Sequence, residues 1–131
     1  MTKLNMNKFI AMKLLLVSLF MMCFAVEAQA QTAERINFKR GTYSTTFRGK
    51  VAKDQEKRYV LGLNRNQKLK VQFTRKMQYV YISIQDGNGN TLKDDNNGSV
   101  EINTTDSGDY YIVISTKYGQ AENFSLRVSA R

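Results

Sequence analysis

Few side chains of this 131-residue chain have the chemistry that a catalytic site requires. The chain contains no His, which is the commonest general base and a frequent metal ligand. Its one Cys, Cys23, excludes an intrachain disulfide and any site built from paired cysteines. Ser107-Gly108 lacks a partner base, so we expect a turn there, with Tyr110 entering the core, rather than a nucleophile. These observations argue against an enzyme, and no cofactor is expected.

One segment, Asp86-Gly-Asn-Gly-Asn90, has the spacing of a metal loop. Its Asp and Asn residues place oxygen-bearing side chains at every second position, as at the start of a calcium loop. The twelfth position, however, is Asn97, where calcium loops carry a bidentate Glu. The Asx-Gly pairs also supply the positive φ that tight β-hairpin turns need. We therefore interpret the segment as a hairpin turn, with weak calcium binding over 86–97 as the alternative.

Basic side chains cluster in residues 48–76. This segment holds ten Lys and Arg residues against two acidic ones, whereas residues 77–131 hold four basic against seven acidic residues. Such a gradient creates a field that steers a protein toward an anionic surface or an acidic cleft. An ordinary solvated sheet face would have the same composition, and nucleic acid is not expected because no nucleic-acid-binding motif accompanies the charge. The candidate partner-binding residues in this segment are Arg48, Lys68, Lys70, Arg75 and Lys76.

Alternation of apolar and polar residues predicts the strands that must position these side chains. The clearest runs are 68–74, 79–84, 110–114 and 123–128, and weaker runs cover 35–38, 43–51, 58–63 and 99–103. Turns rich in Gly, Asn and Asp separate the runs, and no stretch keeps a helical period. About eight short strands without helices predict an all-β fold, an antiparallel sandwich or barrel. The expected core residues are Leu69, Val71, Phe73, Val80, Ile82, Ile84, Ile112 and Leu126.

The first thirty residues have the composition of an export signal. Lys3 and Lys8 precede an apolar run of 13 residues, and Ala28-Gln29-Ala30 supplies the small residues that a signal peptidase requires. Cleavage before Gln31 would leave a single domain, residues 31–131. Because the segment carries three Lys and one Glu, its removal would lower the net charge from +9 to +7.

Two other outcomes for this segment are less consistent with its residues. A membrane anchor needs about 20 apolar residues, more than the run contains. A lipoprotein would be acylated at Cys23, but Met22 stands where a small residue is required. Loss of Cys23 with the signal would leave a domain without thiols, as suits an exported protein. The predicted location is therefore periplasmic or secreted, with no membrane span after cleavage.

Six segments follow one another in an order that resembles a known group. They are Ile36-Asn-Phe-Lys-Arg-Gly41, Phe47-Arg-Gly49, Tyr59-Val-Leu-Gly-Leu63, Asn66-Gln-Lys-Leu-Lys-Val71, Asp106-Ser-Gly-Asp-Tyr-Tyr-Ile112 and Phe124-Ser-Leu-Arg-Val128. The group is the bacterial pre-peptidase C-terminal domain, and within it the chain is most similar to periplasmic inhibitors of goose-type lysozyme. The resemblance covers residues 34–130 and implies a jelly-roll-like β-sandwich.

The resemblance also implies a function and a loop that performs it. In those inhibitors the loop before the last strand is long and rich in Arg, and it helps to plug the lysozyme cleft. The equivalent loop here is 115–122, in which Lys117 is the sole base, so the resemblance adds Lys117, Tyr118 and Gln120 as partner-binding candidates. The implied function is non-catalytic inhibition of a goose-type lysozyme by loop insertion. The alternative is an envelope module that binds an anionic surface polymer through a basic sheet face.

Overall fold

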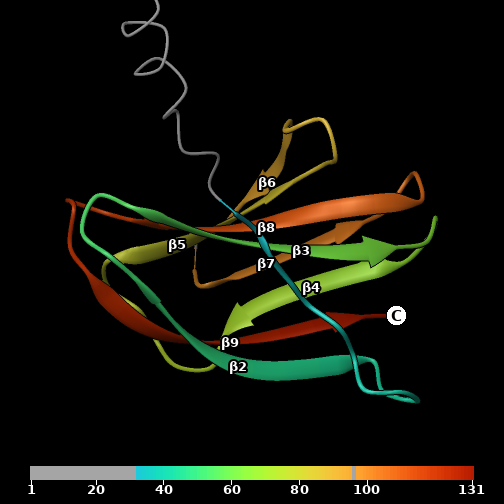
Figure 1. Cartoon of the computed structure of the whole chain (residues 1–131), viewed down its shortest axis with the longest axis horizontal. Helices are drawn as coiled ribbons and strands as arrows, with labels where there is room; N and C mark the ends of the chain where they lie inside the picture. Colours follow the sequence, from blue (N-terminus) through green and yellow to red (C-terminus); the bar gives the residue numbers. More distant parts are fainter. Residues whose placement is uncertain (1–31, 96) are drawn as a thin grey trace, which may run out of the picture. The chain divides into compact units, whose positions relative to one another are not determined.

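Figure 1 shows the computed structural model, which describes residues 32–95 and 97–131. Nine strands form in this part of the chain, and the predicted all-β sandwich is confirmed. They are β1 (Glu34–Arg35), β2 (Ser44–Val51), β3 (Glu56–Leu63), β4 (Lys68–Phe73), β5 (Val80–Gln85), β6 (Thr91–Asp94), β7 (Ser99–Asn103), β8 (Gly108–Thr116) and β9 (Glu122–Ala130). The predicted export signal and its cleavage point fall outside the described residues. Within them, no helix is long and apolar enough to cross a membrane.

The strands form two sheets in the order of a jelly roll. One sheet has the order β1-β3-β8-β5-β6 and the other has the order β2-β9-β4-β7. All neighbours are antiparallel except β1 and β3, which run parallel. Only the β5–β6 hairpin connects neighbours within a sheet, and every other connection between described strands crosses to the opposite sheet. Strands that are adjacent in space are therefore mostly distant in sequence.

The two strands that differ most from the sequence prediction are β1 and β6. β1 is two residues long and shares only Arg35 with the expected run 35–38, although the backbone N–H of Ile36 continues toward β3 by donating to Val60 O at 2.8 Å. β6 was not predicted, because its sequence Thr-Leu-Lys-Asp has a single apolar residue, Leu92, and all four of its residues are exposed. Its existence contradicts a twelve-residue calcium loop, since a strand separates the Asp86–Asn90 segment from Asn97.

The Asp86–Asn90 segment is the predicted hairpin turn, and it joins β5 to β6. The carboxylate of Asp86 accepts hydrogen bonds from the backbone N–H groups of Asn88 and Asn90, both at 2.9 Å. The backbone hydrogen bond from Asn90 is the largest influence that lowers the pKa of Asp86 below its ordinary value. The Asp86 carboxylate, the first of the candidate calcium ligands, is thus used to close the turn.

Side chains from both sheets fill one core. All eight residues expected to be buried are buried. Burial alternates along β4 and β9 as predicted, whereas β5 also buries Ser83 between Ile82 and Ile84. The predicted turn before Tyr110 is also confirmed: Tyr110 is buried and its hydroxyl donates to Asp106 O at 2.7 Å. This contact closes the corner between β7 and β8 in the manner of a tyrosine corner.

An aromatic cluster fills the core beneath β2. The ring centroids of Phe47 and Tyr59 are 4.8 Å apart, and those of Tyr59 and Phe124 are 6.4 Å apart in an edge-on arrangement. Gly49 pairs with Phe124 across the β2–β9 ladder, and a Cβ at Gly49 would overlap the Phe124 ring and the Tyr59 hydroxyl. The absence of a side chain at Gly49 is therefore what admits both rings.

The buried Tyr59 makes the stability of the domain sensitive to alkaline pH. Burial raises the pKa of Tyr59 to about 12, from an ordinary value of 10.0. The folded state favours the neutral phenol. The contribution of Tyr59 to the free energy of unfolding is therefore complete below pH 10 and is lost as the pH rises through 12. We expect urea unfolding to show wild type losing about 2 kcal/mol relative to Tyr59→Phe between pH 9 and pH 12. A constant difference between the two proteins over this range would contradict the prediction.

Candidate functional site

Three loops meet at one end of the sandwich, the end at which β2 finishes and β9 begins. The β2–β3 turn contacts the β8–β9 turn, because a Cβ at Gly119 would overlap the carboxylate of Asp54. The β4–β5 loop is tied to the same place by two contacts: the N–H of Lys117 donates to Tyr79 O, and the N–H of Tyr79 donates to Glu122 Oε2 at 3.2 Å. These contacts make the three loops one continuous surface.

The β8–β9 turn presents Tyr118 at its tip. Tyr118 and Gly119 have φ values of 57° and 64°, and the N–H of Gln120 donates to Lys117 O at 3.4 Å. Two successive residues with positive φ are the mark of a type I′ turn, in which Asn or Gly is usual at the position that Tyr118 occupies. A bulky residue in this conformation is strained, and such strain gathers at functional sites. Tyr118 is also 88% exposed, more than the other exposed large apolar side chains, Tyr43 and Leu92.

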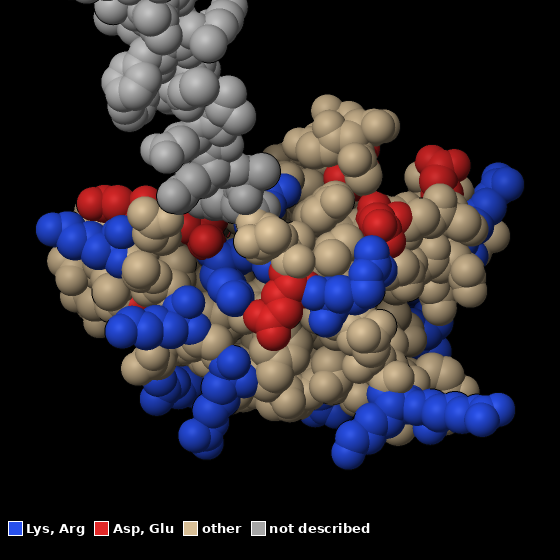
Figure 2. All heavy atoms as spheres, in the orientation of Figure 1, with Lys and Arg blue, Asp and Glu red and all other residues tan. Residues whose placement is uncertain are grey.

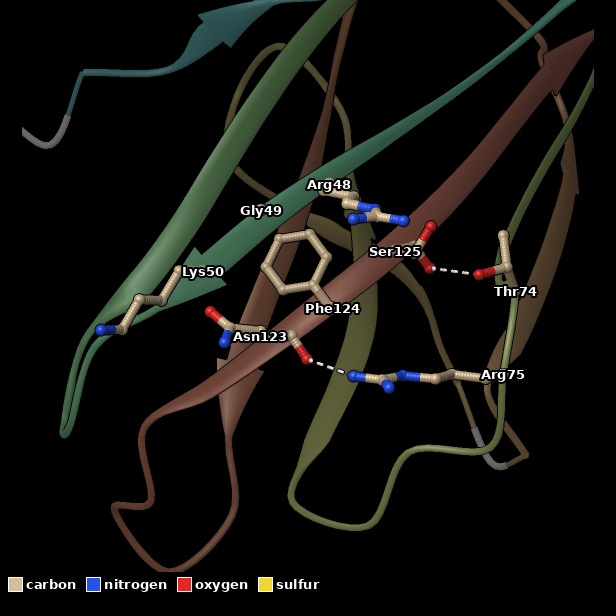
Figure 3. A pocket seen from close by; sticks show the side chains of 8 residues that line it. All are labelled: Arg48, Gly49, Lys50, Thr74, Arg75, Asn123, Phe124 and Ser125. Carbon is tan, nitrogen blue, oxygen red and sulfur yellow. Dashed lines mark hydrogen bonds between the residues drawn. The ribbon is translucent and has the colours of Figure 1, made fainter.

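A basic hollow of about 750 Å³ opens beside this turn, on the outer face of the four-stranded sheet. In Figure 3, Arg48 of β2 and Arg75 of the β4–β5 loop approach β9 from opposite sides. Arg75 Nη2 donates to Asn123 O at 3.5 Å, while neither Arg48 nor Lys50 forms an ion pair with any residue in 32–95 or 97–131. Two of these three cations thus remain available to an anionic partner. The remaining lining residues are Gly49, Thr74, Phe124 and Ser125.

A second hollow, of about 520 Å³, lies on the other side of the β4–β5 loop. It brings Lys76 together with Lys117, although 41 positions separate them in the sequence. Asp95 and Met77 also line it, so this hollow is less uniformly basic than the first. The β8–β9 turn therefore has cationic side chains on both flanks.

The predicted partner-binding residues fall into two groups. Arg48, Arg75, Lys76, Lys117, Tyr118 and Gln120 lie at the end that carries the three loops. Lys68 and Lys70 lie on β4, toward the opposite end of the outer face, where Lys68 Nζ is 3.4 Å from Glu101 Oε1. The basic segment 48–76 does not fold into one patch, because its Lys57 and Arg58 belong to the five-stranded sheet. Those two residues form ion pairs there, of 3.1 Å and 3.8 Å with Glu34 and Glu56.

Two cations of the outer face were not among the predicted site residues. Lys50 follows Arg48 by two positions on β2, and this spacing was a signal in the sequence that both point the same way. Arg127 is isolated from other bases in the sequence, and only strand pairing brings it beside the residues of β4 and β2. Figure 2 shows Lys and Arg side chains along the lower side of the molecule, where Figure 1 places β2 and β9.

The groups that the site presents are suited to binding another molecule. It offers cations, hydroxyl and amide groups and one exposed phenol, and the chain has no His to act as a general base. In the described ranges, no three acidic side chains gather in a group that could hold a metal ion. Exposed charged and aromatic groups at a loop-bearing end are typical of a surface that contacts another macromolecule.

The fold places the protein in the class of small jelly-roll β-sandwiches. Its structure is similar to that of PliG from Aeromonas hydrophila, a periplasmic lysozyme inhibitor of g-type lysozyme, with a TM-score of 0.68 and 20% sequence identity over 76% of this chain and 96% of that one. It is also similar to PliG from Salmonella Typhimurium, an inhibitor of the same kind, with a TM-score of 0.61 and 16% identity over 76% of this chain and all of the other. The fold that the resemblance implied is thereby confirmed.

The pre-peptidase C-terminal domain of a Bacillus anthracis collagenase has the same architecture. The TM-score is 0.53 and the identity 16%, over 80% of this chain and all of that domain. No protein-family model and no curated protein matches the chain. At these identities the similarity establishes a shared fold, and the residues of the site must carry any argument about function.

Proposed function

We propose that this protein is a non-catalytic inhibitor of a goose-type lysozyme and that it acts by inserting its β8–β9 turn into the enzyme cleft. One observation carries the proposal: Tyr118 stands 88% exposed at the tip of a strained turn that two neighbouring loops support. An exposed aromatic side chain on a rigid support loses little conformational entropy on binding. Residues of this type are enriched among those that dominate interface energies.

The charges around the turn suit the proposed target. Glycoside hydrolases use paired carboxyl groups, so their substrate clefts are acidic. Lys117 next to Tyr118, with Arg75 and Lys76 on the β4–β5 loop, gives this end of the sandwich the complementary sign. Complementary charge accelerates association, whereas contacts that lose water on binding slow dissociation. We therefore assign steering to the cations and retention to Tyr118 and Gln120.

The similar solved structures support both the partner class and the location. The two PliG proteins are periplasmic inhibitors, and the fold shared with them presents loops at the ends of the sandwich. A periplasmic location for this protein agrees with the export signal expected at residues 1–30. In this chain the turn before β9 is short and has a single basic residue, Lys117. We therefore expect Tyr118 to contribute a larger part of the binding free energy than an aromatic residue would in a long basic loop.

The proposal is tested by measuring cell-wall hydrolysis by a goose-type lysozyme with and without excess purified protein. We expect strong inhibition whose association rate falls as salt is raised from 50 to 500 mM, since screening shortens the reach of the cations. A hen-type lysozyme serves as the control, and it should keep its activity because the turn is fitted to a different cleft. Full activity of the goose-type enzyme in the presence of the folded protein would overturn the proposal.

A further inference from the structure

The outer face of the four-stranded sheet carries a diagonal line of cations. Lys68 and Lys70 point outward from β4, Arg127 from β9, and Arg48 and Lys50 from β2, since all five are exposed and their strand neighbours are less so. We call these five residues the cation track. It does not depend on the proposed inhibitory turn, which lies at one end of the sandwich rather than on this face.

Strand register sets the spacing of the track. Lys70 pairs with Ser129, and Arg127 pairs with Gln72 on one side and Thr46 on the other. Lys70 and Arg127 are therefore diagonal neighbours, and so are Arg127 and Arg48, which pairs with Ser125. Diagonal neighbours and alternate residues of one strand are both about 7–8 Å apart. The track thus presents five cations separated by four regular steps, over about 30 Å in all.

One acidic residue, Glu101, stands beside the β4 end of the track, where it pairs with Lys70 across the β4–β7 ladder. Among residues 32–95 and 97–131, only Lys68 at one end has an ion-pair partner, Glu101, and this pair is exposed and therefore weak. Lys70, Arg127, Arg48 and Lys50 have none in those ranges. The opposite end of the track opens into the 750 Å³ hollow, where Arg75 adds a further cation. Repulsion among these unpaired charges would be relieved by one extended anion.

The groups between the cations identify the kind of anion. Most other outward positions near the track carry hydroxyl or amide side chains, and the exception is Glu101 of β7, which pairs with Lys70 across the ladder. The hydroxyl and amide residues are Thr46, Gln72, Asn123, Ser125 and Ser129. These groups hydrogen-bond to sugar hydroxyls, whereas single-stranded nucleic acid is normally held by stacking on aromatic side chains. No aromatic residue lies at an outward position of β2, β9, β4 or β7. Nor do these strands offer the buried aromatic or apolar anchor that a protein interface needs.

We propose that the cation track binds a linear acidic polysaccharide that runs diagonally from β4 across β9 to β2. Its carboxylate or sulfate groups would pair with successive cations, and its hydroxyl groups would meet the Ser, Thr, Asn and Gln side chains between them. Because such a polymer is flexible and the sheet is already ordered, most of the ordering cost falls on the polymer. Binding is then dominated by counterion release and is steeply dependent on salt.

The test compares two double variants of the full protein that lose the same charge. Arg127→Gln with Lys70→Gln removes the middle of the track, and Lys39→Gln with Arg65→Gln removes two cations of the β1–β2 and β3–β4 loops that are not part of the track. Binding to polygalacturonate, dextran sulfate and neutral dextran is measured between 50 and 300 mM salt. We expect wild type to bind one or both acidic polymers but not dextran, and the track variant to lose at least tenfold in affinity with a shallower salt dependence. The loop variant should stay within twofold of wild type.

Each other outcome would overturn the assignment. Equal losses in the two variants would mean that net charge alone is responsible, and no binding by wild type at 50 mM salt would remove the site altogether. Tighter binding to single-stranded DNA or to phosphatidylglycerol vesicles than to the acidic polymers, with the same dependence on Arg127 and Lys70, would assign the track to a different macromolecule. Lysozyme inhibition is measured on the same variants and should not change, so failure of this proposal is distinguishable from failure of the inhibitory one.

Discussion

Replacement of Gly49 by alanine is expected to lower the free energy of unfolding by about 2–3 kcal/mol, near the upper end of the usual cost of overpacking a core. The added Cβ would overlap the Phe124 ring and the Tyr59 hydroxyl. Phe124 is 2% exposed and packs on Tyr59 and on Phe73, whose ring centroid is 6.2 Å away, so the ring has no free space to enter. Thermal unfolding should record a fall of roughly 10 °C or more for a domain of this size.

Gly62 provides a matched control for this substitution. It lies within β3, and a Cβ there would meet no atom closer than an Asp109 carboxylate oxygen at 3.6 Å, which is ordinary contact. Gly62→Ala should therefore change stability by less than about 1 kcal/mol, because it only reduces the freedom of the unfolded chain. In a Gly49→Ala background, Phe124→Leu should cost less than it does alone. Equal stabilities of the two alanine variants would show that the aromatic cluster absorbs the extra group.

Replacement of Tyr118 by asparagine is expected to weaken lysozyme inhibition at least tenfold without loss of stability. Asn tolerates positive φ and is common at this position of a type I′ turn, so Tyr118→Asn should relieve strain in the β8–β9 turn. The inhibition constant should nevertheless rise, because an aromatic anchor of this kind typically contributes more than about 1.4 kcal/mol to binding. Titration of lysozyme activity measures the first effect and urea unfolding measures the second.

Tyr43 is the appropriate comparison for Tyr118. It is 61% exposed and precedes β2, at the end of the sandwich away from the three loops. Tyr43→Ala removes the other exposed phenol, at a distance from the turn, and should leave inhibition within twofold of wild type. Inhibition that survives Tyr118→Asn unchanged would show that the turn is not the inserted element, even if the protein does inhibit a lysozyme.

Strand alternation in the sequence was sufficient to predict the core. A strand has a side-chain period of two, so the pattern Leu69-Lys70-Val71 already states which side chains face inward. The same local logic predicted the Asp86–Asn90 hairpin, because its Asx-Gly pairs adopt the required turn without help from distant residues. Alternation could not predict β6, because this strand lies at the edge of its sheet and buries neither face. It is held by pairing with β5.

Only part of the candidate site could be predicted from the sequence. Alternation placed Lys68 and Lys70 on an outer face, and the resemblance directed attention to the loop that contains Tyr118. The positive φ of Tyr118 was not foreseeable from its residue type, since Tyr rarely adopts that conformation. It arises in a tight turn centred on Tyr118 and Gly119, within the five residues that connect β8 to β9, and this turn packs against Asp54 of the β2–β3 turn.

By itself, the sequence determined which side chains of each strand face the core and which face water, because that choice depends on neighbours two positions away. The tertiary structure alone decided which outward side chains meet. Arg127 joins Lys70 and Arg48 because the jelly-roll order places β9 between β4 and β2, although each of those strands is more than fifty residues earlier in the chain. Register between such distant strands is set by the burial of both sheets against one core, and no local pattern encodes it.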